Sequence, residues 1–550
     1  MTTVYEALAD AFIAEGTTHV FGMMGDANMH WMTAMADRGA TLFEARHEGS
    51  GLAMADGWAR GAGQPGIAST TSGPGVTQLA TSLVCASRAG TPLVVFCGEV
   101  ALGDLDAVQY LDQAKFADGV ECGFVQVSSS SKAQEMVQRA FFLARTQSRP
   151  IMVSAPYDVQ LAEFDGPPLY TPSTALIDTA PARPDQGRVQ AAAEIISRSE
   201  RVVVLVGRGA RASDAGELVL KLQKRTKGLI ATTLQAKNWL RESTPFFAGI
   251  SGLYGTATAH ELLQDADCVI AVGASLNHFT TEHGYLYPEA RFVQIDRAEQ
   301  VVSGTGQPVD VYLRGDAPAA LADLLAALPE TPGEAAGYQT PEIEERLRVA
   351  DEVTEPFVQE PGRLDPREVI LALDRLAPPE LPLVTGSGHQ TDFGTMLFTR
   401  PREIVSNYGL FGAIGQAPML TMGWSAARGT PTLVVEGDAS FIMHLAEFDT
   451  ACRYGWPVLV VVMNDEALGA EYHKADAHGL RPELAAIPSP DLGAAAIALG
   501  GRGTTVRAIA ELEEAVNTFI ADPVATVVDV RIIREVLSVP YRRLWQAEDI

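Results

Sequence analysis

Short runs of apolar residues recur along the whole chain, and longer stretches with the periodicity of amphipathic helices separate them. The clearest runs occupy residues 93–97, 202–206, 268–272, 432–435 and 458–463. Runs this short and this rich in β-branched residues favour buried strands over buried helices. Because the runs lack polar alternation, both faces of each strand must be covered, which is typical of parallel sheets. The pattern therefore predicts α/β domains built on doubly wound parallel sheets.

Two stretches rich in proline and glycine, residues 166–184 and about 329–366, interrupt this pattern. Their composition is typical of linkers. A chain of 550 residues is also too long for a single hydrophobic core. We therefore predict three domains, at residues 1–165, 185–330 and 364–550.

The first and third of these blocks resemble each other. Residues 57–65 match residues 423–431 at Gly-Trp and at a later proline, and the match continues through the next predicted helix. The offset between the matched positions changes by a single residue over this stretch, which indicates a duplicated domain. The turns at 71–75 (TSGPG) and 437–440 (GDAS) would then be equivalent strand-to-helix turns.

The turn at 437–440 carries the first candidate chemistry. Open α/β sheets bind ligands at the carboxyl ends of their strands, and a helix that begins here would offer unpaired N–H groups to a phosphate. Asp438 would place a carboxylate beside that phosphate, which is favourable only with a divalent cation between them. Asp465 follows the next apolar run and supplies a second oxygen, so the pair predicts a Mg²⁺ site. The alternative is that Asp438 is a helix cap or a turn residue.

Charge and cysteine content narrow the classes of partner and compartment. The chain has 41 basic and 68 acidic residues and a net charge of −27, so it would repel nucleic acid and anionic membranes. Its five cysteines are scattered singly, which indicates reduced thiols packed in the core rather than disulfides or a zinc site. We find no basic leader and no run of about 18 apolar residues. These features predict a cytoplasmic protein that acts on a small molecule.

Residues 437–465 resemble the cofactor signature of thiamine diphosphate enzymes, in which Gly-Asp-Gly is followed at a similar distance by Asn-Asn. The resemblance extends over nearly the whole chain, in the order pyrimidine-binding, central Rossmann-like and diphosphate-binding domain. This order is typical of acetolactate synthase, benzaldehyde lyase and benzoylformate decarboxylase. Two positions depart from the signature: Ala439 replaces its last glycine and Asp465 its second asparagine. Aspartate keeps an oxygen ligand but adds a negative charge.

The resemblance implies thiamine diphosphate and Mg²⁺ as cofactors. It assigns the metal to the carboxylates of Asp438 and Asp465 and to the main-chain carbonyl of Ala467. It also implies cofactor contacts from three turns and from a residue wedged between the two cofactor rings, namely Gly73, Pro74, Gly75, Gly386, Ser387, Gly388, His389, Gln390, Gly437, Ala439, Ser440 and the wedge Ile414. For Ile414 the alternative is ordinary core packing.

Residues 46–60 are similar to the Arg-His-Glu segment that carries the catalytic glutamate of this family, here Glu48. In that role a glutamate bonds ring nitrogen N1′ and favours the imino form of the aminopyrimidine, which then takes the C2 proton to give the ylid. On the residues alone, Glu48 at a helix start would instead be a partner of the helix dipole. With the resemblance, we expect Glu48 to be catalytic.

The implied reaction is attack of the ylid on the carbonyl of a 2-oxo acid or 2-hydroxy ketone, through an enamine that is protonated or captured by a second carbonyl. Gln109 aligns with a glutamine that carboligases of the family direct at the cofactor, and the His-His pair of pyruvate decarboxylases is missing. These points favour an acetolactate synthase-like carboligase or lyase over a simple 2-oxo acid decarboxylase. Asn28 and His47 are further candidates for the catalytic site, although each could equally be a turn residue or a satisfied core group.

Other interpretations stay open. Residues 202–212 fit the G-x-G-x-x-A dinucleotide pattern of a nicotinamide oxidoreductase, but the acidic residue expected at the end of the following strand is missing. A catalytically silent homologue is a further alternative, against which the presence of Glu48 and Asp438 argues. The resemblance also implies a homodimer or homotetramer with active sites at the subunit interface. The C-terminal segment 539–550 would either cover the active site or dock on the surface.

Overall fold

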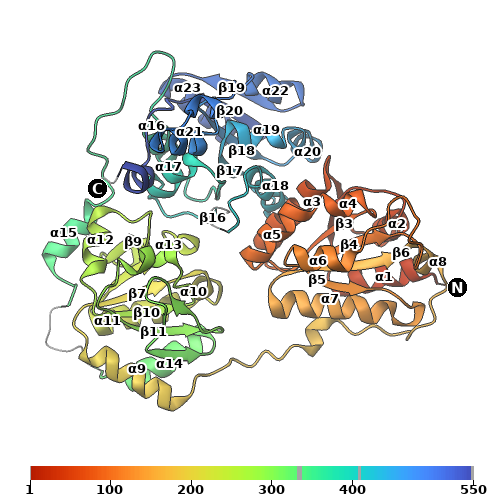
Figure 1. Ribbon diagram of the computed structural model, residues 1–550, viewed down its shortest axis with the longest axis horizontal. Coiled ribbons are helices and arrows are strands. Elements are labelled where there is room, and N and C mark those ends of the chain that lie inside the picture. The colour runs from red at the N-terminus through yellow and green to blue at the C-terminus, as the bar shows by residue number, and fades with distance from the viewer. Residues whose placement is uncertain (1, 331–336, 407–409, 547–550) are drawn as a thin grey trace.

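The computed structural model describes residues 2–330, 337–406 and 410–546, which form three lobes (Figure 1). Each lobe is built on one six-stranded sheet, and all strand pairs within these sheets are parallel. The predicted fold class, three doubly wound α/β domains, is confirmed. Residues 331–336 of the second predicted linker and residues 547–550 of the C-terminal segment lie outside the described residues.

The N-terminal sheet has the strand order β2-β1-β3-β4-β6-β5. Its strands are β1 (His19–Gly22), β2 (Thr41–Glu44), β3 (Gly66–Thr70), β4 (Leu93–Glu99), β5 (Gly123–Gln126) and β6 (Pro150–Pro156). Its helices are α1 (Val4–Ala14), α2 (Met29–Asp37), α3 (Glu48–Ala62), α4 (Pro74–Thr77), α5 (Ala80–Ala89), α6 (Gln113–Gly119), α7 (Ala133–Gln147) and α8 (Tyr157–Leu161). Two clusters of core side chains cover the two faces of the sheet, so β3 is buried along its whole length and β4 up to its last residue.

The C-terminal sheet has the order β16-β15-β17-β18-β20-β19, which is the order of the N-terminal sheet strand for strand. Its strands are β15 (Leu383–Thr385), β16 (Ile404–Ser406), β17 (Thr432–Gly437), β18 (Val458–Asn464), β19 (Arg502–Val506) and β20 (Thr526–Arg531). Its helices are α16 (Pro366–Leu376), α17 (His389–Leu397), α18 (Ala417–Arg428), α19 (Asp438–Met443), α20 (Glu447–Tyr454), α21 (Gly469–Ala477), α22 (Leu492–Ala498), α23 (Ile509–Ala521) and α24 (Val539–Tyr541). The shared topology confirms the internal repeat, because the TSGPG turn follows β3 and the GDAS turn follows its counterpart β17.

The central sheet has the order β14-β11-β10-β7-β8-β9. Its strands are β7 (Val202–Val206), β8 (Leu229–Thr232), β9 (Phe247–Ile250), β10 (Cys268–Val272), β11 (Arg291–Asp296) and β14 (Val311–Arg314), and β12 (Val301–Val302) and β13 (Gln307–Pro308) form a short hairpin beside it. Its helices are α9 (Gln186–Arg198), α10 (Arg208–Ala212), α11 (Gly216–Thr226), α12 (Ala257–Gln264), α13 (His278–Thr281) and α14 (Ala317–Ala327). This domain has its own core on both faces of the sheet.

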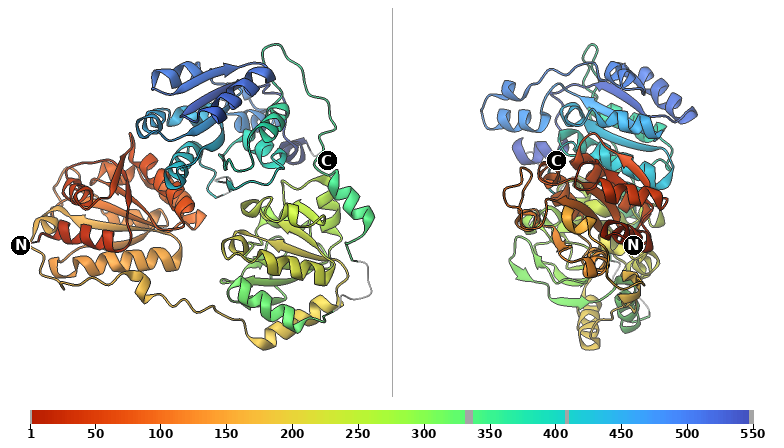
Figure 2. Two further views of the ribbon diagram at one scale, coloured as in Figure 1. Left: turned by 180° about the vertical axis from the view of Figure 1, so that it is seen from behind. Right: turned by 90° about the vertical axis from the view of Figure 1, so that its right-hand side faces the viewer.

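The two predicted linkers differ in structure. An extended segment with one short helical turn, Ser173–Leu176, connects the N-terminal domain to the central domain (Figure 2). The second stretch contains a helix that the prediction did not include, α15 (Pro341–Arg348). Thr340 caps this helix. Leu347 is buried in the core of the central domain and Ile343, one turn earlier, packs against the same core, so a narrow apolar face orders a charged segment.

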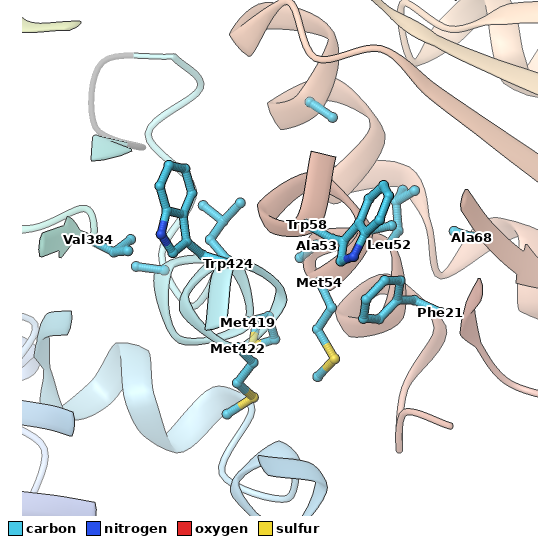
Figure 3. Close-up of a cluster of buried hydrophobic side chains, with 14 of the residues drawn as sticks. Phe21, Leu52, Ala53, Met54, Trp58, Ala68, Val384, Met419, Met422 and Trp424 are labelled. Carbon is cyan, nitrogen blue, oxygen red and sulfur yellow. The ribbon is translucent and has the colours of Figure 1, made fainter. Parts of the chain in front are cut away.

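The N-terminal and C-terminal domains meet along α3 and α18. Met54, Trp58, Met419 and Trp424 belong to one core that continues from one domain into the other (Figure 3). The two helices run in the same direction, since Gly61 packs beside Ala427 towards their ends and Ser82 bridges their starts. The contact therefore places the beginning of α3 next to the beginning of α18.

The cysteines and the apolar character of the helices were the subject of two expectations from composition. All five cysteines are unpaired, and four of them are buried, as expected of thiols used for packing. Among the helices that the structure describes, none combines the length and the apolar character needed to cross a membrane.

Candidate active site

Asp438 and Asp465 lie at the carboxyl ends of two neighbouring strands. β17 and β18 pair in parallel with Gly437 opposite Met463, so the residues that follow emerge at the same edge of the sheet. Both aspartates are buried. Burial and the nearby charge of Asp465 raise the pKa of Asp438 to about 7. Burial also raises the pKa of Asp465 to about 6, although the charge of Arg534 opposes this shift. Two buried carboxyl groups are costly to ionise together unless a cation compensates them.

The loop after β18 is shaped around the Asp465 carboxylate. Its Oδ1 accepts the main-chain N–H of Ala467 at 3.0 Å. A Cβ on Gly469, the first residue of α21, would overlap Oδ2, so glycine is needed there to leave room for the carboxylate. Glu466 between them has a φ of +57°, a left-handed conformation that turns the chain sharply.

A cavity opens at this edge of the sheet. The described residues that line it belong to the C-terminal domain and include no lysine or arginine. They bring together most cofactor contacts that the resemblance implied: Ser387, Gly388, His389, Gln390, Ile414, Gly437, Asp438, Ala439, Ser440, Asp465 and Ala467. Glu471, which sequence analysis did not single out, adds a further carboxylate to the wall. Within the described residues, no group of three or more His, Cys, Asp or Glu side chains could hold a metal, so any cation here must also use main-chain oxygen.

The loop at residues 386–390 packs against a buried acid. Gln390 Nε2 donates to Ser387 O at 3.1 Å and to Glu436 Oε1 at 2.9 Å. A Cβ on Gly386 would overlap the Glu436 carboxylate, which keeps this loop free of side chains at that point. Burial raises the pKa of Glu436 to about 7. Sequence analysis missed Glu436, although a glutamate at the end of an otherwise apolar strand is a signal that could have revealed it.

Ser387 has an unusual environment in this loop. Its Oγ is buried and has no hydrogen-bond partner among the described residues. The residue also lines the cavity that contains Asp438 and Asp465. A buried hydroxyl without a partner is unfavourable, so this Oγ is suited to donate to an anionic oxygen in the cavity.

The C-terminal segment docks behind the cavity. His389 Nε2 accepts the main-chain N–H of Ser538 at 3.0 Å, and the Ser538 hydroxyl donates to Asp392 Oδ2 at 2.7 Å. Burial holds the pKa of His389 well below its usual value and raises that of Asp392 to about 7. Arg543 donates to the carbonyl of Gly255 at 2.7 Å in the central domain. Through residue 546 the segment therefore lies against two domains, in agreement with the docking alternative.

Glu48 lies in the N-terminal domain at the first position of α3. The preceding residue, His47, caps the helix by accepting the N–H of Gly49 on Nδ1 at 3.1 Å, and its Nε2 lies 3.0 Å from Gln78 Oε1. The Glu48 carboxylate is half-buried and faces the TSGPG turn, since Oε1 would lie 3.3 Å from a Cβ on Gly75. The structure thus brings Glu48 and His47 to the turn that contains Gly73, Pro74 and Gly75.

Gln109 reaches the same turn from the loop after β4. Ser72 Oγ donates to Gln109 Oε1 at 2.5 Å. Gly73 has a φ of +52°, and a Cβ on it would lie 2.6 Å from the carbonyl oxygen of Gln109, so glycine is required for this close approach. The segment with Gln109 is therefore held against the turn that faces Glu48.

Asn28 is completely buried and its amide is fully engaged. Its Nδ2 donates to Met23 O at 3.0 Å and to Ser69 Oγ at 2.9 Å, and its Oδ1 accepts the N–H of Gly25 at 2.7 Å. These bonds hold the turn before α2 against β3. This environment corresponds to the structural alternative left open for Asn28.

The halves of the candidate site approach each other where α3 and α18 begin. Ser82 Oγ lies 2.8 Å from Gly49 O and 3.0 Å from Gln416 Oε1. Glu48 directly precedes the first of these residues, and Ile414 lies two positions before the second. The candidate catalytic carboxyl group from one domain and the candidate wedge from another are thereby brought to adjacent helix starts.

The central domain carries the dinucleotide-like pattern. Gly207 and Gly209 follow β7 and pack closely against Gly273 after β10. The neighbouring strand β8 ends at Thr232, so the acidic residue of the nicotinamide pattern is indeed absent from that position.

Comparisons with known proteins identify all three domains. Residues 2–119 match the model of the thiamine pyrophosphate enzyme N-terminal TPP binding domain, residues 189–324 the central domain, and residues 387–530 the C-terminal TPP binding domain. These matches argue against the alternative of a nicotinamide oxidoreductase.

Relatives that align over most of the chain support the same assignment. An acetolactate synthase large subunit of Parasynechococcus marenigrum is 30% identical over 84% of this chain and 76% of its own length. A probable acetolactate synthase large subunit of Methanocaldococcus jannaschii is 28% identical over 85% of this chain and 81% of its own. A sulfoacetaldehyde acetyltransferase of Castellaniella defragrans is 27% identical over 98% of this chain and 95% of its own. The chain therefore belongs to the thiamine pyrophosphate enzyme family and is a thiamine diphosphate-dependent enzyme that forms or cleaves carbon–carbon bonds.

Proposed function

We propose that this enzyme is a Mg²⁺-dependent, acetolactate synthase-like carboligase or lyase that acts on a 2-oxo acid or a 2-hydroxy ketone. The observation that carries the proposal is the pair of buried carboxylates, Asp438 and Asp465, at the ends of neighbouring strands. Burial raises the pKa of both groups, and the positive charge of Arg534 only partly opposes this effect at Asp465. A hard divalent cation with oxygen ligands matches this donor set.

The residues at this edge of the sheet would bind the diphosphate end of the cofactor. Asp438, Asp465 and the carbonyl oxygen of Ala467 would hold Mg²⁺. Ser387 fits a phosphate oxygen because its buried Oγ has no partner among the described residues. The start of α19 adds main-chain N–H groups that point out of the helix.

The N-terminal domain would serve the reactive end. When bound, thiamine diphosphate supplies a carbon nucleophile and an electron sink for breaking a bond next to a carbonyl group. We propose that Glu48 holds a proton on its carboxylate for the aminopyrimidine ring, and that Ile414 packs against the folded cofactor. Gln109 and His47 would contribute polar groups towards the substrate. For Asn28 we propose an indirect role, because its amide is occupied by the turn that it stabilises.

We further propose a homodimer or homotetramer in which two copies complete each active site. The described lining of the Asp438 cavity comes from the C-terminal domain alone, whereas Glu48 belongs to the N-terminal domain. A complete site needs both domains, and the family resemblance implies that they come from different subunits.

The test is a calorimetric titration of the apo protein with thiamine diphosphate, with and without Mg²⁺, for wild type and Glu48→Gln. We expect Mg²⁺-dependent binding in both proteins and turnover in the wild type only. Pyruvate and benzoylformate serve as donors, and CO₂, aldehyde and 2-hydroxy ketone are quantified. Hydroxy ketone as the main product supports a carboligase, whereas aldehyde as the main product supports the decarboxylase alternative. Failure of the wild type to bind thiamine diphosphate would falsify the proposed site.

A second class of donor substrate needs its own assay. The sulfoacetaldehyde acetyltransferase relatives align over 98% of this chain. Sulfoacetaldehyde is therefore included as a substrate, with acetyl transfer as the readout. Activity with this compound and not with the 2-oxo acids would replace the carboligase proposal by an acetyltransferase.

A further inference from the structure

An arginine that follows β20 binds the backbone of the loop that carries Asp465. Arg534, three residues after β20, donates through Nε to the carbonyl oxygen of Asp465 at 2.9 Å and through Nη2 to that of Glu466 at 3.1 Å. A second bond from Nη2 also reaches Asp465 O. The guanidinium lies over the ring of Tyr472 in α21, 5.1 Å from its centre. Arg534 is thus held by backbone carbonyls and an aromatic face.

Among the described residues, Arg534 differs from its neighbouring arginines in having no acidic side chain as an ion-pair partner. Two neighbouring arginines are committed to carboxylates, since Arg363 pairs with Glu466 and Arg531 pairs with Asp529 and Glu466. In the part of the chain that the structure describes, Arg534 forms no salt bridge with an aspartate or glutamate. Its positive charge acts on the carboxylates of this loop: it opposes the rise in the pKa of Asp465 and contributes to the lowered pKa of Glu466.

The positive charge of Arg534 lies next to the position, 465, at which this chain departs from the family signature. Aspartate at position 465, where the signature has asparagine, places a second negative charge beside Asp438. No described lysine or arginine lines the cavity to balance it. An uncompensated second carboxylate would attract a cation but repel the diphosphate that must share the site. A cation placed behind the loop can offset the added charge without occupying the cavity.

We propose that Arg534 is a positioning residue that neutralises the additional charge of Asp465 and holds its loop in place. Asp438, Asp465 and Arg534 together leave one net negative charge, the same as an Asp–Asn pair. The third carboxylate of the cavity wall, Glu471, is paired with Lys474. The inference rests on the proposed metal and diphosphate site. It assigns to Arg534 an electrostatic role that binding measurements can separate from a purely structural one.

The sign of each effect follows from this charge balance. Arg534→Met leaves two uncompensated carboxylates, so Mn²⁺ alone should bind more tightly and thiamine diphosphate more weakly, each by about tenfold. Asp465→Asn leaves one carboxylate and one guanidinium, so Mn²⁺ alone should bind about tenfold more weakly. The double variant restores one net negative charge, and both affinities should return towards those of the wild type. A merely structural role predicts instead that Arg534→Met weakens thiamine diphosphate binding by the same factor with or without Asp465→Asn, so that the double variant shows no rescue.

The experiment uses the full-length apo protein in four forms: wild type, Arg534→Met, Asp465→Asn and the double variant. Electron paramagnetic resonance reports the affinity for Mn²⁺ without diphosphate, and calorimetry reports that for thiamine diphosphate at saturating Mg²⁺. Circular dichroism verifies that each variant is folded. Arg534→Lys, which keeps the charge but loses the forked hydrogen bonds, should retain most of the diphosphate affinity. This variant keeps the test decisive if Arg534→Met does not fold.

Arg363→Met is the matched control, because Arg363 bonds the same loop through the side chain of Glu466. Arg363 also acts on Asp465, but after Arg534, and its charge is paired with Glu466. We therefore expect smaller changes of the two affinities in this variant than in Arg534→Met, and no full rescue by Asp465→Asn. Absence of rescue in the Arg534 double variant, or a loss in Arg534→Lys as large as in Arg534→Met, would overturn the role of Arg534 while leaving the cofactor site intact. A wild type that binds neither Mn²⁺ nor thiamine diphosphate would overturn the proposed function and this inference together.

Discussion

Gly57 of α3 and Gly423 of α18 each lie directly against the backbone of the opposite helix. A Cβ on Gly57 would overlap the carbonyl oxygen of Leu420, and a Cβ on Gly423 would overlap that of Met54. The two glycines occupy equivalent positions in the internal repeat. The contact between the domains is therefore pseudo-symmetric, and it depends on the absence of a side chain at both positions.

Alanine at either glycine should disrupt this contact. The added methyl group meets backbone rather than a movable side chain, so Gly57→Ala or Gly423→Ala should lower the free energy of unfolding by about 1–3 kcal/mol. Urea denaturation measures the change. The control is Gly119→Ala, because a Cβ there meets nothing within 4 Å; its effect should stay within about 0.5 kcal/mol. Equal effects of the three substitutions would contradict the interpretation.

Ser387→Ala should weaken cofactor binding without weakening the fold. Its Oγ is buried without a partner in the described structure, so its removal should leave the unfolding free energy of the apo protein nearly unchanged. The affinity for thiamine diphosphate should fall by about tenfold, as expected when a charge-assisted hydrogen bond is lost. Thr385→Val is the matched control, since Thr385 Oγ1 is equally unpartnered but does not line the cavity. Loss of affinity in the control as well would remove Ser387 from the site.

The contribution of Asp438 and Asp465 to the stability of the metal-free protein should fall as the pH rises from about 4 to about 7. The pKa of Asp438 is raised from 3.8 to about 7, so between these values the folded state binds more protons than the unfolded chain. Asp465, with a pKa of about 6, acts in the same direction. Thermal unfolding of the apo protein across this pH range measures the slope.

The matching experiment uses Asp438→Asn and saturating Mg²⁺ with thiamine diphosphate. Asparagine removes one titrating group, so the slope of the apo protein should become flatter. Mg²⁺ favours the ionised carboxylates, so the rise in Tm caused by the cofactors should increase with pH over the same range. A cofactor-induced shift that is independent of pH would argue against a cation bound by these carboxylates.

Mixing inactive variants tests whether two copies complete the active site. Glu48→Gln and Asp438→Ala should each abolish turnover. In a mixed dimer with sites across the interface, one site carries both substitutions and the other carries neither, so activity should reappear after subunits are exchanged. Light scattering on the same samples gives the oligomeric state. No recovery despite demonstrated exchange would show that each site is built within one chain, where Glu48 and Ile414 already lie at adjacent helix starts.

The elements and the candidate chemistry could be predicted in large part from the sequence. Apolar runs such as 202–206 and 458–463 correspond to the strands β7 and β18, because a strand buried on both faces must be apolar throughout. The meeting of Asp438 and Asp465 was also predictable, since each follows an apolar run and neighbouring parallel strands end at the same edge. The helix α15 was missed because most of its residues are charged and exposed, and its apolar pair Ile343 and Leu347 spans a single turn within a stretch rich in proline and glycine.

Sequence alone thus determined the three-domain α/β architecture, the internal repeat and the residues that we propose to bind a cation and a diphosphate. These properties depend on local patterns and on contacts between consecutive elements. Only the tertiary structure decided how the environment of each group modifies it: Ser387 is left without a partner, Asn28 is occupied by its own turn, and Arg534 lies behind Asp465 although 69 positions separate them in the chain. Burial, hydrogen-bond satisfaction and charge balance depend on neighbours in space, and no spacing along the chain encodes them.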